Sequence, residues 1–357
     1  MANNCTPNVQ KAIFDLYSGS SWRAQTGVLD MAFSQANGAE VQAQMIQQNG
    51  KDSVYSITYP AEVCTAIVDV GEVACADAGT DVGNTTCQTF NSFDGKSSEW
   101  HNITVDQVRD IGSLTVTQAI GHGVMQQMQK IKDAIGAVGV AAINTNAGCI
   151  STTETTRSLK LVDSQTGKPY PHTITEIEND FADAGYPGSP ILLGNRQINY
   201  LRNASGRGGV SDQGFNNQNL LDIPAFYDRN IKAGTVDPTT PGYENVFALL
   251  PQVFNVLTYS KNAGMFASRN AERDWNSIDP MKLVNTDNST FMHTVLTDPA
   301  NGMLYDFSIV YDPKCEKFQW RIRSYYKMFL LTPTGCKDSC FNGIIKYDIC
   351  PWVAPEC

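Results

Sequence analysis

The chain has 357 residues, enough to bury a large core in one elaborate domain or in two to three ordinary ones. Apolar residues make up 42% and charged residues only 17%, against a usual charged fraction of about 25%, which indicates a folded protein with a surface rich in uncharged polar residues. The net charge of -10 argues against capture of DNA or RNA by the electrostatic field of the whole protein, although local basic patches remain compatible with it.

The first ten residues, MANNCTPNVQ, have neither a basic start nor an apolar core, so the sequence shows no signal peptide or lipid anchor. The longest run of apolar or small residues, 134–143, is about half of the ~20 residues that a membrane-spanning helix requires. We therefore expect a soluble protein. Ten cysteines are unusual without a secretion signal, because disulfides are rare in a reducing cytosol, and a protein made inside a cell and later released would reconcile the two.

The first third of the sequence predicts little core. Residues 12–47 show a mixed pattern with short helical stretches, which is typical of an arm. From 53 to 108 the chain is rich in β-branched and aromatic residues, interrupted by turn-forming clusters such as ADAGTDVGNTTC. Because the middle of this region has little apolar density, we expect an extended β-loop that packs on another surface.

A long amphipathic helix is predicted over 117–144, roughly 40 Å at about 1.5 Å per residue. Apolar residues recur along one stripe at spacings of three or four: Ile120, Val124, Met128, Ile131, Ile135, Val138 and Ala142. The polar residues are predicted to occupy the other faces: Gln126, Gln129, Lys130, Lys132 and Asp133.

Four glycines interrupt this helix: Gly121, Gly123, Gly136 and Gly139. Each costs about 1 kcal/mol of helix propensity relative to alanine, so we expect them to permit a bend or a close packing contact. The Gly-His-Gly sequence around His122 is not predicted to bind a metal, because the other three histidines are scattered and no H-E-x-x-H motif occurs.

After the helix the pattern alternates between strands and helices. SLKLV predicts a short strand, and Thr173 with Glu176 forms a capping box for a helix that Gly185 ends. SPILLG predicts a buried strand, and Asn195 can cap a second short helix. The segments LLDIPAFYD and YENVFALLPQVFNVLTY read as further strands, and FMHTVL, MLYDFSIVY and FQWRIRSYYKMFLL predict an antiparallel meander in which apolar and polar residues alternate.

No arrangement of residues predicts catalysis. The nearest approach to a nucleophile elbow is GYPGSP, in which Ser189 is followed by a proline, and no phosphate-binding loop, dinucleotide fingerprint or calcium loop occurs. Glu176 and Glu178 are two residues apart on a predicted helix and therefore face apart. We expect a protein without enzymatic activity, catalytic residues, bound metal or cofactor.

The cysteines are the remaining candidates for covalent chemistry. The C-terminal spacing C-x3-C-x9-C-x6-C differs from the C-x2-C knuckles of zinc ribbons, so disulfides or free buried thiols fit it better than zinc. Disulfides within this tail or to Cys315, and across the predicted β-loop, remain open, and their connectivity cannot be read from the sequence. The candidate disulfide residues are Cys64, Cys75, Cys87, Cys315, Cys336, Cys340, Cys350 and Cys357.

Taken in order, these elements resemble an α+β fold, that of the major capsid proteins of tailed bacteriophages, the Hong Kong 97-type fold. The resemblance rests on the arm, the β-loop, the long helix, the segment ITEIENDFADAGYPGSPILLGNRQINYLRN and the returning strands MLYDFSIVY and FQWRIRSYYKMFLLTP. It implies the following division: an N-terminal arm (1–50), an E-loop (51–110), a spine helix with peripheral domain (111–160), an axial domain (161–290), returning peripheral strands (291–335) and a Cys-rich C-terminal tail (336–357).

The resemblance implies a structural role. Such a subunit would assemble with itself into hexamers and pentamers of an icosahedral virion shell, would be made in the host cytoplasm, and would meet portal, scaffold or decoration proteins. It would hold packaged double-stranded DNA only by enclosure and would not touch a membrane. A tail, neck or decoration protein, or a disulfide-braced extracellular binding protein or hydrolase, is the alternative.

Overall fold

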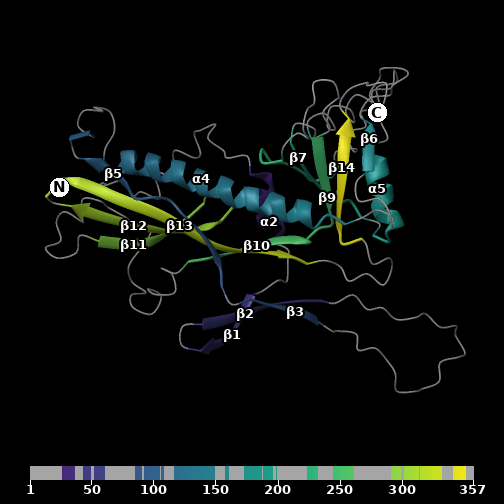
Figure 1. The fold of residues 1–357 in the computed structure, drawn as a ribbon, viewed down its shortest axis with the longest axis horizontal. Coiled ribbons are helices and arrows are strands. Elements are labelled where there is room, and N and C mark those ends of the chain that lie inside the picture. Colours follow the sequence, from purple (N-terminus) through teal and green to yellow (C-terminus); the bar gives the residue numbers. More distant parts are fainter. Residues whose placement is uncertain are drawn as a thin grey trace, which may run out of the picture. The chain divides into compact units, whose positions relative to one another are not determined.

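The computed structural model describes the chain in segments: residues 26–36, 43–49, 52–60, 85–90, 92–104, 106–107, 116–148, 157–160, 173–186, 188–195, 198, 223–231, 244–260, 291–298, 301–312, 314–331 and 341–350. Its helices are α2 (Gly27–Ala36), α4 (Val116–Thr145) and α5 (Thr173–Asp183), and its strands form three sheets (Figure 1). The chain divides into two compact units, one formed by 1–25, 93–138 and 256–328 and the other by the remaining residues.

The first sheet is antiparallel and three-stranded. It consists of β1 (Ala43–Asn49), β2 (Asp52–Pro60) and β3 (Thr85–Phe90), with β2 in the centre. A bulge between Met45 and Gln47 shifts the register of β1 against β2. Strands with many turn residues between them were expected here, and the described part confirms that β structure.

The second sheet is six-stranded and belongs to the first unit except for the first two residues of β10 and the last two of β13, which fall in the second unit. Its strands are β4 (Asp94–Ser97), β5 (His101–Thr104), β10 (Phe254–Tyr259), β11 (Phe291–Thr297), β12 (Leu304–Asp312) and β13 (Lys317–Leu330). The order is β10-β13-β12-β11, with β4 and β5 also paired to β13. The predicted meander of the last three strands is confirmed. β4 and β5, which lay in the predicted β-loop, pair instead with β13.

The third sheet is five-stranded and belongs to the second unit. Its order is β6 (Arg157–Lys160), β14 (Ile344–Cys350), β9 (Glu244–Leu249), β7 (Ile191–Gly194), β8 (Ala225–Tyr227). The two outer pairings, β14 with β6 and β7 with β8, are parallel, and the inner ones are antiparallel. The segment 344–350, which was assigned to a Cys-rich tail, is therefore an interior strand of this sheet.

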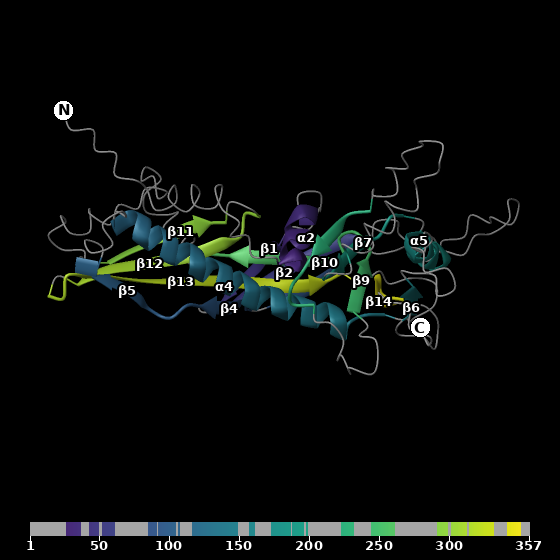
Figure 2. The same ribbon diagram turned by 90° about the horizontal axis from the view of Figure 1, so that it is seen from above.

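The predicted long helix is confirmed as α4, and its first half buries the predicted stripe from Ile120 to Ile135. Figures 1 and 2 show α4 lying along β13. The predicted apolar stripe is wrong at its C-terminal end. Val138 is 40% exposed, whereas Gly139 and Ile143 are buried. The buried face turns here because the last part of α4 packs in the second unit, where a Cβ at Gly139 would lie 3.3 Å from the side chains of Val28 and Phe254.

Lys132 also departs from the predicted pattern. It was predicted to lie on a face of the helix other than the apolar stripe, yet it is only 3% exposed, and its Nζ lies 3.6 Å from Oδ2 of Asp298, which is 4% exposed. Asp298 begins the turn from β11 to β12, where its backbone N–H donates to the carbonyl of Met303. A buried ion pair thus joins α4 to the β11–β12 turn. The spacing of apolar residues along one helix cannot predict a partner on another element.

The glycines of α4 serve close packing. An added Cβ at Gly123 would lie 2.7 Å from Cζ2 of Trp320, a buried side chain on β13. Carbon atoms do not approach so closely without displacement of one of them, and an indole ring in a packed interior has little room to move. Of the two roles predicted for the glycines, the structure supports the packing contact at Gly123.

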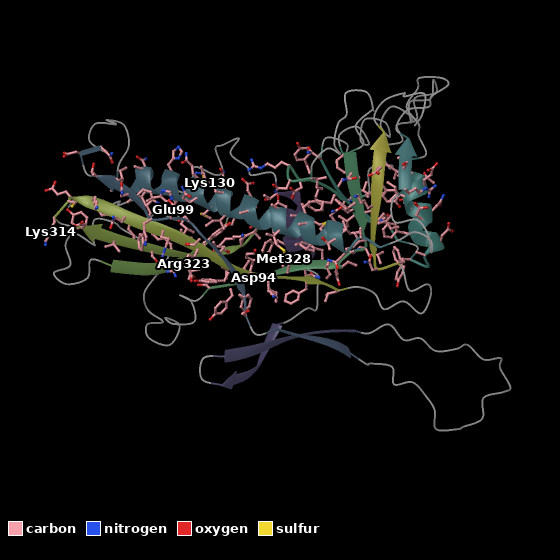
Figure 3. All side chains as sticks on the ribbon, in the orientation of Figure 1. Asp94, Glu99, Lys130, Lys314, Arg323 and Met328 are labelled. Atoms are coloured by element: carbon pink, nitrogen blue, oxygen red, sulfur yellow. The ribbon has the colours of Figure 1, made fainter. Side chains whose placement is uncertain are left out.

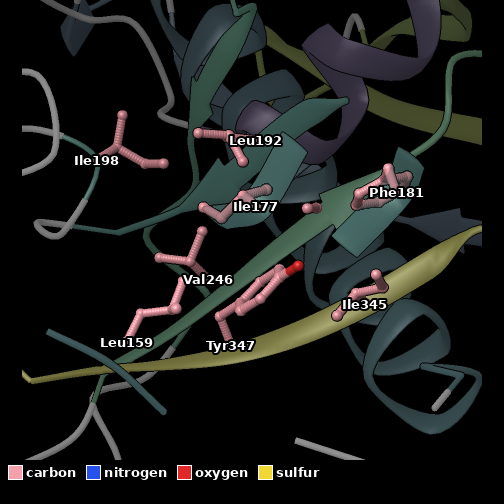
Figure 4. Packing of buried hydrophobic residues seen from close by; sticks show 9 residues of the cluster. Leu159, Ile177, Phe181, Leu192, Ile198, Val246, Ile345 and Tyr347 are labelled. Carbon is pink, nitrogen blue, oxygen red and sulfur yellow. The ribbon is translucent and has the colours of Figure 1, made fainter. Parts of the chain in front are cut away.

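Helix α5 is confirmed over Thr173–Asp183 and ends at Gly185 as predicted. Its end is a Schellman motif: Gly185 has φ of +92°, its N–H donates to Ala182, and the N–H of Tyr186 donates to Phe181. The buried face packs on the five-stranded sheet (Figure 4). The cluster contains Leu159, Ile177, Phe181, Leu192, Ile198, Val246, Ala248, Ile345 and Tyr347.

Helix α2 lies within the region that was predicted as an arm, but it is part of a core. Val28 and Leu29 are fully buried, and the N–H of Val28 donates to Oδ2 of Asp228, 200 residues away in sequence, at 2.9 Å. A Cβ at Gly27 would lie 2.3 Å from the carbonyl oxygen of Tyr227, so only glycine permits this approach. The start of α2 is thereby fixed against the end of β8.

Replacing Lys132 by methionine should lower the free energy of unfolding by about 3–5 kcal/mol, because it leaves the carboxylate of Asp298 buried without its cation. The double variant Lys132→Met/Asp298→Ala should lose less than the sum of the two single variants, since the second change removes the stranded charge. Urea unfolding of the four proteins measures this. Strictly additive losses would show that the pair contributes nothing.

Replacing Gly123 by alanine should lower the free energy of unfolding by about 1–3 kcal/mol, because the collision with Trp320 exceeds the gain of about 1 kcal/mol in helix propensity. Gly188→Ala is the control, since an added Cβ there meets nothing within 4 Å. A Gly123→Ala protein more stable than the parent would instead favour the bend over the packing contact.

Candidate functional site

One cluster of ionisable side chains in the second unit surrounds the buried Asp180 and Tyr347, while its other members, Arg157 and Glu176, are partly exposed. Arg157 on β6 forms ion pairs with Asp180 and Glu176 on α5, the latter at 3.4 Å between Nη2 and Oε2. The hydroxyl of Tyr347 on β14 donates to the other oxygen of Asp180 at 2.9 Å. Three elements that are far apart in sequence therefore meet at a single carboxylate.

Burial dominates the protonation of this cluster. It raises the pKa of Asp180, and the hydrogen bond from Tyr347 and the charge of Arg157 oppose that rise only in part. The pKa of the Tyr347 hydroxyl is also raised, first by burial and then by the neighbouring carboxylate. Since both oxygens of Asp180 are engaged by protein groups, this arrangement joins strands to a helix and presents no free base or nucleophile.

A second charged feature is the outer face of β13, on the six-stranded sheet. Residues at even positions from Phe318 to Tyr326 are buried on the side of α4, where Trp320 meets Gly123. The odd positions point to the opposite side, on which Figure 3 shows Arg323. We call the partly exposed cations on this side the β13 basic face, namely Lys317, Arg321, Arg323 and Lys327.

Trp100 borders this face from the link between β4 and β5. It is 41% exposed, and the guanidinium of Arg321 lies 4.8 Å from the centre of its ring. The link is held to β13 by two hydrogen bonds: the N–H of Ser98 donates to the carbonyl of Ile322, and the N–H of Ile322 donates to Oγ of Ser98. Trp100 is thus an exposed aromatic side chain on a fixed backbone.

The cysteines predicted to form disulfides mostly lie outside the described residues: Cys64, Cys75, Cys336, Cys340 and Cys357. Cys87 lies in β3 and Cys350 ends β14, where the backbone alone is described. Cys315 lies in the turn between β12 and β13, is exposed and has a free thiol. The disulfide pairings therefore stay predictions.

Within the described segments, no group of three or more His, Cys, Asp or Glu side chains is arranged to hold a metal ion. None of the described helices combines the length and apolar character that crossing a bilayer demands.

Comparisons with known proteins find likeness only in structure. No family model matches the chain, and no curated protein matches its sequence. A chain of the cyanophage A-1(L) capsid superposes on it with a TM-score of 0.50 over 94% of this chain and 95% of that one, at 13% identity. The chain has a phage capsid fold.

Other capsid structures match less closely: Ralstonia phage GP4 with a TM-score of 0.44 at 10% identity, covering 86% of this chain and 85% of that one, and a native gene transfer agent particle with 0.42 at 8% identity, covering 92% of each. At 13% identity, the fold shared with the cyanophage chain is carried by element order and packing. This agrees with the predicted α+β class, because the chain mixes long helices with separate sheets.

Sequence reasoning missed the buried cluster, although one signal was present. Asp180 follows Ile177 by three residues, which places it on the buried face of α5, but its partners Arg157 and Tyr347 are 23 and 167 residues away. The β13 basic face had a clearer signal, because Arg321 and Arg323 alternate with the buried Trp320 and Ile322.

The raised pKa of Asp180 predicts the pH dependence of one variant. Between its ordinary pKa of 3.8 and its raised value, the folded state binds more protons than the unfolded state at this site, so its contribution to stability is lost as pH rises through this window. Asp180→Asn removes that loss. The free energy of unfolding of Asp180→Asn minus that of the parent should therefore increase as pH rises from below 3.8.

Urea unfolding at a series of pH values measures the difference. Asp183→Asn, on the exposed side of the same helix, is the control for the removal of one negative charge. A relative stability of Asp180→Asn that declines with rising pH would contradict the prediction.

Proposed function

We propose that the chain is the major capsid protein of a tailed phage, which assembles with itself into an icosahedral shell around double-stranded DNA. The observation that carries the proposal is the fold shared with the cyanophage A-1(L) capsid chain along 94% of this chain and 95% of that one. The subunit would act as a structural protein of the virion, without enzymatic activity.

In Hong Kong 97-type terms, we propose that α4 is the spine helix and that the six-stranded sheet belongs to the peripheral domain. The five-stranded sheet with α5 would form the axial domain. The E-loop would be the β1–β2–β3 sheet and its connections, about 43–90, because β4 and β5 pair with β13. The proposed loop is therefore shorter than the 51–110 expected from the sequence, and the arm would end before α2.

The three-stranded sheet supports this assignment by its composition. β1 and β2 read AQMIQQN and DSVYSITYP, in which polar residues outnumber large apolar ones. A sheet of three short strands requires a packing partner for stability. In a shell, a neighbouring subunit would supply that partner, so that the loop joins one subunit to the next within hexamers and pentamers.

The number of cysteines also fits a capsid protein that is made inside a cell and later released. A subunit made in the reducing host cytoplasm keeps its cysteines reduced, and lysis moves the virion into oxidising surroundings. We propose that disulfides among the candidate cysteines form after release. We also propose that the subunit contacts portal, scaffold or decoration proteins. Thiol counting before and after lysis tests the disulfides independently of assembly.

The purified full-length chain should form closed shells or hexameric and pentameric capsomers, visible by sedimentation and negative-stain electron microscopy. Rings or tubes of another symmetry would indicate a tail or neck protein instead. A stable monomer under all conditions tested, or hydrolysis of a substrate by the monomer, would contradict the capsid function.

Deletion of 43–90 with a short glycine-serine linker should leave a folded subunit and abolish shell formation, because the deleted strands pair only with one another among the described strands. Circular dichroism and urea unfolding measure folding, and sedimentation measures assembly. A deletion extended to 104 is the matched comparison. It also removes β4 and β5 from β13, and should impair folding itself. Shells formed by the 43–90 deletion would contradict the E-loop assignment.

A further inference from the structure

Positive charge is concentrated on a single strand of this acidic chain. Residues 314–327 hold five of the 26 lysines and arginines and only one acidic residue, Glu316. Four of the five cations form the β13 basic face defined above, which runs along one side of the sheet. The whole-chain charge of -10 therefore conceals a local stripe of the opposite sign.

The two central cations of the stripe form no ion pair with any residue that the structure describes. Lys317 and Lys327 form ion pairs with Asp312 and Asp94 at 3.9 and 3.6 Å. Among the described residues, no carboxylate forms an ion pair with Arg321 or Arg323. Asp306, which pairs in register with Arg323, is 3% exposed and accepts a hydrogen bond from Ser260.

The arginines are also short of hydrogen-bond acceptors. The Nε atoms of both are buried and have no partner. The pKa of Arg321 is lowered, first by burial and then by repulsion from Arg323. An anion placed between the two guanidinium groups would relieve that repulsion and accept hydrogen bonds from both forks.

We propose that the β13 basic face binds the phosphate backbone of double-stranded DNA, with Arg321 and Arg323 as the central phosphate contacts and Trp100 at the border. The proposal deepens the proposed function and rests on it, because the subunit of a shell around double-stranded DNA has that DNA as a polyanionic partner. It replaces the expectation that DNA is held only by enclosure with a direct contact.

The dimensions of the stripe favour a polyanion over the carboxylates of a second copy. From Lys317 to Lys327 the stripe extends for roughly 33 Å at about 3.3 Å per residue. The acidic residues of α5, from Glu176 to Asp183, extend for only about 10 Å at 1.5 Å per residue. A DNA backbone carries phosphates along the full length of the stripe, whereas α5 could match only a part of it.

The test is the salt dependence of binding between the purified full-length chain and a fluorescein-labelled DNA duplex, followed by fluorescence anisotropy. The parent should bind at low salt, and Arg321→Gln/Arg323→Gln should weaken binding at least tenfold. It should also reduce the slope of log K against log salt by about 1.8, or about 0.9 for each lost phosphate contact. Arg321→Lys/Arg323→Lys should fall between the two, because it keeps the charge and loses the fork.

Lys96→Gln/Lys130→Gln is the matched control, since it removes two charges on the side of α4: Lys96 pairs in register with Ser324, and Lys130 is exposed on the helix (Figure 3). It should bind DNA like the parent. Equal binding by Arg321→Gln/Arg323→Gln and the control would overturn the proposal. Unchanged DNA binding with lost assembly would assign the stripe to a second copy and would also overturn it.

Electron microscopy and urea unfolding of the same proteins separate the failures. If shells form normally and the arginine variant binds DNA like the parent, the phosphate contact is contradicted. The proposed capsid function is then unaffected. Absence of shells from the parent itself contradicts the capsid function. An arginine variant that unfolds in urea like the parent confirms that any loss of binding comes from the missing cations.

Discussion

The contact of α4 with β13 is the constraint on which the six-stranded sheet depends. β13 is fourteen residues long and pairs with β4, β5, β10 and β12, so it holds together segments drawn from three separate parts of the chain. One face of that strand must be covered, and the helix approaches it closely enough that Gly123 has no room for a side chain beside Trp320. A glycine that weakens the isolated helix thereby strengthens the packed one, because the buried indole contributes more than helix propensity removes.

Charges in this chain are used in two opposite ways. Lys132 with Asp298 is a buried ion pair, and the partly exposed Arg157 forms an ion pair with the buried Asp180, which also accepts a hydrogen bond from Tyr347. Both groups join elements distant in sequence, and removing one member leaves a charge without its partner, which is costly. Arg321 and Arg323 are partly exposed on the outer face of β13, and no carboxylate among the described residues forms an ion pair with them. Pairing within the core stabilises the subunit, whereas unpaired cations on the surface are available to a partner outside it.

The capsid fold persists here at 13% identity to the cyanophage chain because it depends on classes of residue more than on particular ones. A long amphipathic helix, alternating strands and a sheet with covered faces can be written in many sequences, provided that total volume and pattern are kept. The positions at which the residue type is most restricted are single close contacts, such as Gly27 against Tyr227 and Gly123 against Trp320. These are the sites at which we expect substitutions to be tolerated least.

Local patterns in the amino-acid sequence were sufficient for α4, for α5 with its glycine stop, for the buried strand β7 and for the antiparallel β11–β12–β13 meander, because each depends on neighbours three, four or two residues apart. They were insufficient for β14, which lies in the sheet interior between β6 and β9 although it follows a cysteine-rich stretch, and for α2, whose start is capped by Asp228. The buried position of Lys132 and the turn of the α4 face after Ile135 were likewise decided by tertiary contacts. In every such case the decisive partner lies far along the chain, and only the folded structure brings the two together.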